Sequence, residues 1–291
     1  MKKRSMGDRI FDAIVYAILV VVFLIVFFPL MYVVSTSFAS ARELALNKFL
    51  IFPKHPTLEV YQYIFSTSTF LRSMIVTIVI TVVGTLVNLV MTCLMAYPLS
   101  RKALPGRSVI MTAVTFTLVF SGGMIPTYLV VNSLGLIDTY TSLILPGAIS
   151  SFNLILVKNF FQEIPESLID AAQIDGSSEM NTLVKIVLPL SKPALATFTM
   201  FYAVGHWNQF MQPLLYLNDS KKWTIQILLR QIVLMSQSGV GDEDAMPPGF
   251  VLPVKSLKMA CIVVSTLPII AAYPFMQKYF DKGVMSGSVK G

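Results

Sequence analysis

Long, almost uncharged apolar stretches restrict what this chain can fold into more than any other feature of the sequence. They begin near residues 10, 73, 108, 140, 194 and 257. A helix that crosses a bilayer needs about 20 consecutive apolar residues, and each stretch is close to or beyond that length. Charged residues make up 13% of the chain, compared with about 25% in a typical soluble domain. The sequence therefore predicts an all-α polytopic membrane protein with six transmembrane helices.

Basic residues on the short loops predict how these helices are oriented. Four basic residues precede the first apolar stretch, and the loop Arg101–Arg107 carries three basic residues and no acidic one. Short loops rich in Lys and Arg stay in the cytoplasm. We therefore expect both termini in the cytoplasm. Since these loops hold much of the basic excess behind the net charge of +7, we expect a lipid membrane as partner and no nucleic acid.

The first apolar stretch, from about Ile10 to Val34, follows a basic start and precedes a small-residue triplet at residues 39–41 that resembles a cleavage site. A secretory signal has an apolar region of only about 7–15 residues, so an uncleaved helix is the better interpretation. We expect residues 1–72 to form the first transmembrane helix and an extracytoplasmic loop with short surface helices. Residues 73–291 should form a five-helix core with a cytoplasmic loop at 163–192.

Glycine and proline interrupt two of the apolar stretches. Ser121, Gly122 and Gly123 lie inside the third, and Pro146 and Gly147 inside the fourth. Such residues break or bend a helix, and irregular backbone at membrane depth must be covered by protein or line a cavity. We expect a fifth span over residues 194–217 and a sixth over 257–273. Between them we expect a helical segment near residues 225–233, which lies at the membrane interface or packs on a neighbour, and a flexible acidic loop at 239–248.

The polar segment 165–193 has the pattern of a short helix followed by a stop. Pro165 suits a first helical position, and Glu166 places negative charge in the first turn. Leu168, Ala171 and Ala172 have the spacing of one helix face, and Gly176 supplies a stop. Any cytoplasmic loop can carry such a helix, so the pattern alone does not decide its role.

The motif Asp170-Ala171-Ala172, Gly176, then Ile186-x-Leu188-Pro189 resembles the EAA loop of binding-protein-dependent ABC importer permeases. Asp170 occupies the position at which that family has Glu, so the negative charge is kept. Other stretches resemble the carbohydrate-uptake, maltose-permease-like branch, among them residues 96–101, 134–136, 207–208 and 277–283. The ending Val289-Lys290-Gly291 resembles the subgroup that serves complex oligosaccharides with lipoprotein-type binding proteins.

This resemblance implies the type I ABC importer permease fold in a bacterial cytoplasmic (inner) membrane. It also implies import of sugars or oligosaccharides by alternating access, coupled to a separate ATPase through the loop. The partners would be a second homologous permease, two ABC ATPase subunits and an extracytoplasmic solute-binding protein. The chain has no G-x-x-x-x-G-K-[ST] motif, so we expect no enzyme activity and no bound cofactor here, with ATP and Mg on the partner ATPases. The resemblance assigns ATPase coupling to Glu166, Leu168, Asp170, Ala171, Ala172, Asp175, Gly176, Ile186, Leu188 and Pro189.

Polar residues inside spans are candidates for the substrate pathway. The fifth stretch carries the polar residues His206, Asn208 and Gln209, and the candidates for the pathway are Trp207, Asn208, Gln209, Ser121 and Gly122. Helix–helix hydrogen bonding is an alternative for the polar ones, and a membrane-boundary anchor is an alternative for Trp207.

Other chemistry finds little support in the sequence. The two histidines, His55 and His206, are far apart and make a poor metal site, and no G-x-S-x-G motif occurs. Cys93 and Cys261 lie in apolar stretches, so we expect buried thiols and no disulfide. A self-contained secondary transporter or channel is the main alternative function, although it would need an ion or proton relay that these spans, with few charged groups, do not suggest. A membrane-bound enzyme is a more distant one.

Overall fold

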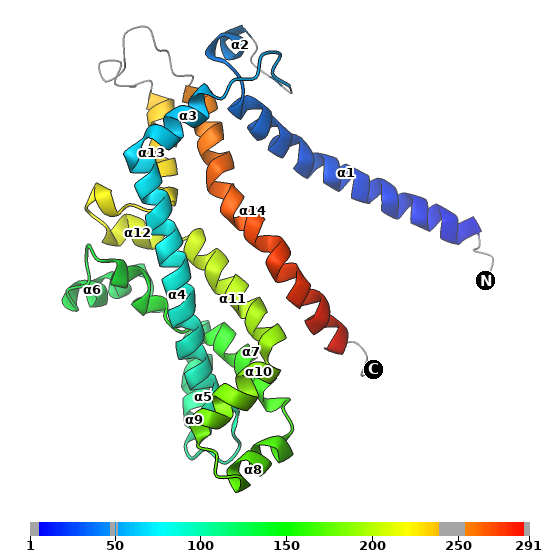
Figure 1. Cartoon of the computed structure of the whole chain (residues 1–291), viewed down its shortest axis with the longest axis vertical. Coiled ribbons are helices and arrows are strands. Elements are labelled where there is room, and N and C mark those ends of the chain that lie inside the picture. The colour runs from blue at the N-terminus through cyan, green and yellow to red at the C-terminus, as the bar shows by residue number, and fades with distance from the viewer. Residues whose placement is uncertain (1–5, 47–49, 51, 239–253, 288–291) are drawn as a thin grey trace. The chain divides into compact units, whose positions relative to one another are not determined.

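The computed structural model describes residues 6–46, 50, 52–238 and 254–287. This part of the chain divides into two compact units, which we describe separately. Unit 1 contains residues up to Phe70 together with Leu229–Leu267, and unit 2 contains Leu71–Leu228 and the residues from Pro268 onward. Figure 1 shows that the described elements are helical throughout.

Unit 1 begins with α1, Met6–Ser37, which is followed by two short helices, α2, Ala41–Leu46, and α3, Glu59–Ser66. No described side chain of α1 between residues 10 and 30 is buried. An apolar helix surface of this size needs lipid or another subunit to cover it. The short helices confirm the expectation that the segment before residue 72 contains helices of its own.

Side-chain contacts hold the segment after α1 in place. The Tyr61 hydroxyl lies 2.7 Å from Ser37 Oγ, and the Tyr61 ring packs on that of Phe38 with centroids 5.0 Å apart. Burial raises the pKa of Tyr61 above its ordinary value. Glu43 Oε1 accepts the N–H groups of Lys54 and His55 at 2.8 and 2.9 Å. These bonds satisfy backbone donors that a loop would otherwise leave to water.

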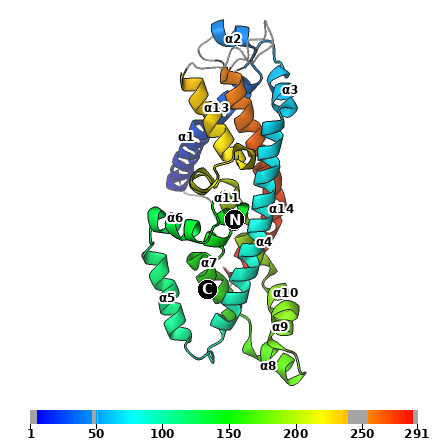
Figure 2. The same ribbon diagram turned by 90° about the vertical axis from the view of Figure 1, so that its left-hand side faces the viewer.

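Unit 2 is arranged along α4, Ser68–Ser100, which Figures 1 and 2 show as one continuous helix. One side of α4 carries a row of small polar residues at helical spacing, all buried except Thr81, which is half-buried. Its members are Ser73, Thr77, Thr81, Thr85, Asn88 and Thr92. We call this row the polar stripe. In a membrane, polar side chains of this kind join helices by hydrogen bonds.

Both predicted interruptions are confirmed. Helix α5, Arg107–Val119, meets α6, Met124–Ser133, at a bend of 117° across the Ser121-Gly122-Gly123 segment. Figure 2 shows this turn clearly. The 3-10 turns η1, Tyr140–Leu143, and η2, Leu145–Gly147, meet α7, Ser151–Gln162, at 53°.

The next stretch contains several short helices before a long one. They are α8, Glu166–Ile174, α9, Glu179–Thr182, the π-helix η3, Leu183–Val187, α10, Leu188–Leu190, and α11, Lys192–Trp207. The segment Glu179–Leu190 meets α11 at 86°.

The predicted fifth span, residues 194–217, is not one continuous helix, because α11 ends at Trp207 and α12, Met211–Tyr216, is separate. Asn208 ends α11: its backbone N–H and its side-chain Nδ2 both donate to Val204 O, at 3.1 and 3.0 Å. Gln209 Nε2 then donates to Leu143 O at 3.2 Å, which ties the chain to η1.

The remaining helices follow the expected order but not all the expected bounds. The turn η4, Ser220–Lys222, leads to α13, Ile225–Ser238, which confirms the predicted helical spacing near residues 225–233. Helix α14, Val254–Gly287, is longer than the predicted span 257–273 and continues through two prolines. The predicted acidic loop 239–248 lies outside the described residues.

Two apolar clusters form the interior of unit 2. The larger joins the carboxyl half of α4 to α5, α7, η3 and α11, and the smaller joins α4 to α6, η1 and α12. Three helices of the described chain are long and apolar enough to cross a membrane, or up to six if each bent pair is one span. Cys93 and Cys261 are buried and free, as predicted.

Candidate functional site

Helix α8 is the first element of the candidate coupling site, and it lies near the end of unit 2 to which the carboxyl end of α4 runs (Figure 1). It begins at Glu166, so Pro165 is the residue before the helix and not its first residue as predicted. The Pro165 carbonyl accepts the N–H of Leu168 at 3.1 Å and so closes the first turn. Glu166 places a carboxylate in that first turn, where the helix dipole favours it.

Gly176 ends α8 in the predicted way. Its φ of 79° lies in the left-handed region, which a residue without Cβ enters easily. The Gly176 N–H donates to Gln173 O at 3.0 Å and the Ser177 N–H donates to Ala172 O at 2.9 Å. This pair of bonds is the Schellman arrangement, and it satisfies carbonyls that the helix end would leave unpaired.

The structure divides the residues of α8 between an inward and an outward face differently from the prediction based on spacing. Ile169 and Ala172 are only 4% and 8% exposed, so Ala172 packs inward. Leu168 is 45% exposed and Ile174 is 87% exposed, and Ala171 is exposed between them. Leu168, Ala171 and Ile174, spaced three residues apart, therefore form the outward apolar face, which we call the α8 face. The acidic residues Asp170 and Asp175 are also exposed beside it.

After Gly176, the chain returns to the core through residues that the motif does not name. Leu183 and Val187 are buried in the larger apolar cluster. Ile186 and Leu188 are half-buried and Pro189 is exposed, so the motif residues lie at the rim of the cluster. A π-helix, which is rare and often found at functional sites, covers this stretch.

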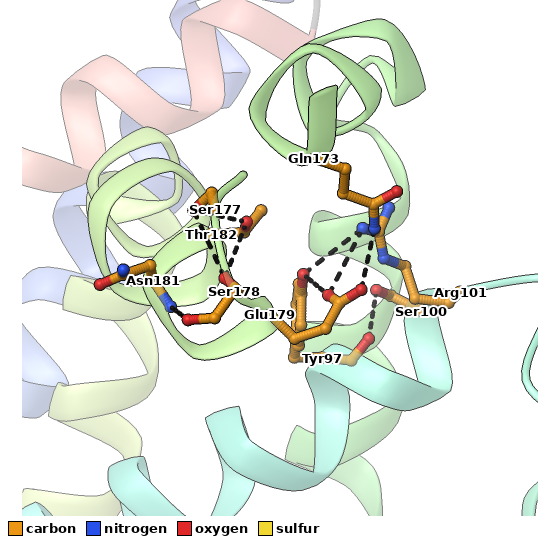
Figure 3. Close-up of polar contacts among 9 residues, drawn as sticks. All are labelled: Tyr97, Ser100, Arg101, Gln173, Ser177, Ser178, Glu179, Asn181 and Thr182. Carbon is orange, nitrogen blue, oxygen red and sulfur yellow. Dashed lines mark hydrogen bonds and ion pairs between the residues drawn. The ribbon is translucent and has the colours of Figure 1, made fainter. Parts of the chain in front are cut away.

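A polar network joins α8 and α9 to the carboxyl end of α4 (Figure 3). The Tyr97 hydroxyl donates to Glu179 Oε2 at 2.5 Å, and Gln173 Nε2 donates to Glu179 Oε1 at 2.8 Å. The Arg101 guanidinium lies 3.8 Å from the same carboxylate and 5.3 Å from the centroid of the Tyr97 ring. One carboxylate on α9 thus contacts both α8 and α4.

Neighbouring bonds fix the carboxyl end of α4, on which Tyr97 lies and which Arg101 directly follows. Gln162 Nε2 donates to Ser100 O at 3.2 Å, and Arg107 Nε donates to Leu99 O at 2.8 Å. Carbonyls in the last turn of a helix have no partner within the helix, so these side chains complete the hydrogen bonding of α4.

The residues predicted for the substrate pathway are not gathered into one site. Ser121 and Gly122 are exposed at the bend between α5 and α6. Asn208 is exposed at the end of α11, and Gln209 is half-buried against η1. Trp207 is only 5% exposed, so its ring offers little surface to a solute in this structure. Their role stays a prediction. Among the described residues, no cluster of three or more His, Cys, Asp or Glu side chains has the arrangement of a metal site.

Comparison with known proteins identifies the family. The model of the family described as "Binding-protein-dependent transport system inner membrane component" matches residues 1–286. The chain belongs to this family of permeases. It is 51% identical, over 98% of its own length and 100% of the relative's, to the polygalacturonan/rhamnogalacturonan transport system permease protein YtcP of Bacillus subtilis (strain 168). It is 53% identical to protein LplC of the same organism, over 98% and 96% of the two chains.

A solved structure confirms the permease fold. The match is to a chain of a bacterial ABC transporter involved in the import of the acidic polysaccharide alginate, with a TM-score of 0.90 and 31% identity. It covers 96% of this permease and 100% of that chain. The all-helical architecture predicted from the sequence is therefore that of a known ABC permease.

Sequence reasoning missed two residues of the network, Gln173 and Glu179. Tyr97 and Arg101 lie in a stretch that resembles the family, but nothing in the sequence pairs that stretch with Glu179, which follows Tyr97 by 82 residues. Helical periodicity reports local neighbours only.

Proposed function

We propose that this permease is one transmembrane subunit of an ATP-driven importer of sugars or oligosaccharides. It pairs with a second homologous permease, receives its solute from an extracytoplasmic binding protein and is driven by two separate ABC ATPase subunits. ATP and Mg bind to those ATPases, and this chain binds no cofactor and is not an enzyme. Transport proceeds by alternating access.

The α8 face carries the coupling part of this proposal. Leu168, Ala171 and Ile174 expose apolar surface on a short helix whose opposite side is buried. An apolar helix face with acidic neighbours, among them Asp170, is suited to a groove on another protein. The buried Ala172 and the stop at Gly176 hold the face in position. Ile186, Leu188 and Pro189 continue the same loop back to the core.

The proposed topology has six spans with both termini in the cytoplasm of a bacterium, in the inner membrane. Helices α1, α4 and α14 supply three spans, α5 with α6 and η1–η2 with α7 supply two more, and α11 supplies the sixth. In this arrangement, residues 73–291 form the five-helix core and the loop 163–192 faces the ATPases. Short basic loops such as Arg101–Arg107 support the orientation.

The substrate class rests on the relatives. YtcP is named for polygalacturonan and rhamnogalacturonan transport, and the solved neighbour is involved in alginate import. We therefore propose that oligosaccharides released from such polymers are imported, with Trp207, Asn208, Gln209, Ser121 and Gly122 near the pathway.

The test is retention of the ATPase on purified permease pairs, measured beside uptake of oligogalacturonides in cells. Ile174→Asp places a charge on the α8 face, and an unpaired carboxylate is costly to bury. We expect ATPase retention to fall about tenfold or more and uptake to fall with it. Ala171→Leu should also lower ATPase retention and uptake, because its larger side chain overpacks the contact.

Controls separate docking from folding. Ile174→Leu keeps the apolar surface and should retain the ATPase, and Asp170→Glu should be nearly silent. Ala172→Leu overpacks a buried site, so it should lower the stability of the permease itself. Normal ATPase retention in both Ile174→Asp and Ala171→Leu would show that α8 is not the docking element. Uptake driven by an ion gradient without any ATPase would favour a secondary transporter instead.

A further inference from the structure

We infer that Glu179 is a positioning residue that ties the ATPase-facing loop to α4 through Tyr97, an assignment that rests on the proposed function. Glu179 touches neither the α8 face nor, in the contacts described above, any residue expected in the substrate pathway. Its two carboxylate oxygens contact different helices: Oε1 accepts from Gln173 of α8 and Oε2 accepts from Tyr97 of α4.

The hydrogen bond between Tyr97 and Glu179 is the strongest contact in this connection. Tyr97 is 6% exposed, so its ring is fixed by packing and its hydroxyl has little freedom to turn away. A hydroxyl that donates to a carboxylate forms a charge-assisted bond, which is shorter and stronger than a neutral one. The Glu179 side chain itself is 63% exposed, and Arg101 lies 3.8 Å from it. An ion pair so open to solvent contributes little on its own.

The backbone of Glu179 is also held. Ser178 precedes α9, and its Oγ accepts the N–H of Asn181 at 3.3 Å, which caps the short helix that Glu179 begins. Figure 3 shows this cap and the Tyr97 contact on the two sides of the same turn. A displacement of α8 therefore reaches Tyr97 through a carboxylate with a fixed backbone and a fixed partner.

Helix α4 connects this point to the interior of the unit. Asn88 Nδ2 donates to Gly147 O at 2.6 Å, at the break between η2 and α7. Thr92 Oγ1 and the Tyr202 hydroxyl of α11 lie 2.7 Å apart. Farther along, Thr77 Oγ1 accepts the N–H of Ile225 at 2.8 Å. The polar stripe thus links the helix that Glu179 contacts to the broken fourth span, to α11 and to the start of α13. Hydrogen-bond networks and rigid helices of this kind carry coupling between distant sites.

The competing interpretation is that Glu179 is an ordinary loop carboxylate whose bonds only satisfy nearby donors. The two interpretations differ in one measurable quantity, the number of ATP molecules hydrolysed for each oligosaccharide transported. A purely local role leaves that ratio unchanged, whereas a positioning role raises it when the connection is cut.

The experiment uses the complete importer in proteoliposomes: this permease, its partner permease, the ATPases and the binding protein, with oligogalacturonides as the transported probe. Glu179→Gln removes the charge from this bond and leaves a weaker neutral acceptor, and Tyr97→Phe removes the donor. We expect both variants to retain the ATPase, and we expect the ATP-to-sugar ratio to rise about tenfold, within the usual range of coupling between sites. Because both changes act on the same bond, the double variant should be no worse than the more severe single variant.

Glu163→Gln is the matched control, since it removes the same charge from an exposed position just before α8 and outside the network. Its ratio should equal that of the unmodified importer. An unchanged ratio in Glu179→Gln and Tyr97→Phe would overturn the inference while leaving ATPase docking through α8 intact. Loss of the ATPase from Glu179→Gln would make Glu179 a docking residue and would also overturn it. Whether the ATPase docks through α8 is measured separately, by ATPase retention in the Ile174→Asp variant.

Discussion

Gly84 of α4 lies directly against His206 of α11, and this contact requires a residue without a side chain. A Cβ atom placed on Gly84 would lie 2.5 Å from His206 Nε2. The same nitrogen is 2.7 Å from Asn88 Oδ1. Because Asn88 Nδ2 already donates to Gly147, its Oδ1 accepts and His206 Nε2 is the donor. The alternative of helix–helix hydrogen bonding, left open for polar residues in the fifth span, therefore applies to His206.

We predict that Gly84→Ala displaces the His206 ring and breaks its bond to Asn88. Overpacking of this kind costs about 1–3 kcal/mol. The thermal unfolding temperature of the purified permease pair should fall, and uptake should fall with it. Gly205→Ala is the control, because a Cβ on Gly205 has no neighbour within 4 Å and alanine favours a helix. Equal unfolding temperatures for the two variants would contradict the prediction.

At the scale of elements, Asp138 joins two loops that lie 80 residues apart in sequence. Its N–H donates to Tyr216 O at 2.7 Å, and its Oδ1 accepts the N–H groups of Asn218 and Asp219 at 3.2 and 3.1 Å. Lys222 Nζ lies 2.8 Å from Asp138 Oδ2 and donates to Asp138 O at 2.7 Å. The hydrogen bond from Lys222 lowers the pKa of Asp138, and the Asp138 carboxylate raises the pKa of Lys222.

This arrangement predicts a stability that depends on pH. Since the folded pKa of Asp138 is lowered, its stabilisation is present above the unfolded value of about 3.9 and is lost as the pH falls through the folded value. We expect the unfolding temperature of the unmodified permease to exceed that of Asp138→Asn at pH 7 by a small amount, as both groups are open to solvent. The difference should decrease as the pH falls below about 4 and vanish below the folded pKa of Asp138. A difference that stays constant from pH 7 to pH 3 would argue against this.

The sequence predicts elements where local chemistry decides them and fails where distant contacts decide them. The bend between α5 and α6 follows from Gly122 and Gly123, and the end of α8 follows from Gly176. The end of α11 at Trp207 was missed because the apolar stretch continues beyond it, while the contact that secures the break, Gln209 with Leu143, spans 66 residues. The outward face of α8 was also misjudged, since spacing groups Ala172 with Ala171 and only packing separates them.

At the scale of the whole molecule, orientation in the membrane is the property that the proposed function requires most. Lys102 follows α4 on a short basic loop, and Lys221 lies in η4 on the loop expected outside. Both residues are exposed, whereas the native Cys93 and Cys261 are buried. These positions can therefore report which side of the membrane each loop faces.

We predict that a membrane-impermeant thiol reagent added to intact cells labels Lys221→Cys and not Lys102→Cys. Permeabilising the cells should expose Lys102→Cys to the same reagent. The basic loop explains the expected protection, because Lys and Arg are retained on the cytoplasmic side. Labelling of Lys102→Cys from outside would contradict the six-span topology with internal termini.

The polar stripe of α4 has a consequence for how the chain is made. Asn88 and Thr92 contact His206 and Tyr202, which are synthesised 118 and 110 residues later. Thr77 Oγ1 bonds to Ser73 O within its own helix at 2.8 Å, and bonds of this type let a threonine enter lipid before a partner exists. Asn88 has no such local bond among the described contacts: Gly147 O, the acceptor for its Nδ2, follows 59 residues later, and His206, the donor to its Oδ1, follows only with α11. Biogenesis of this permease therefore includes an interval in which Asn88 and Thr92 of α4 lack their full set of partners, and that interval ends only when α11 is synthesised.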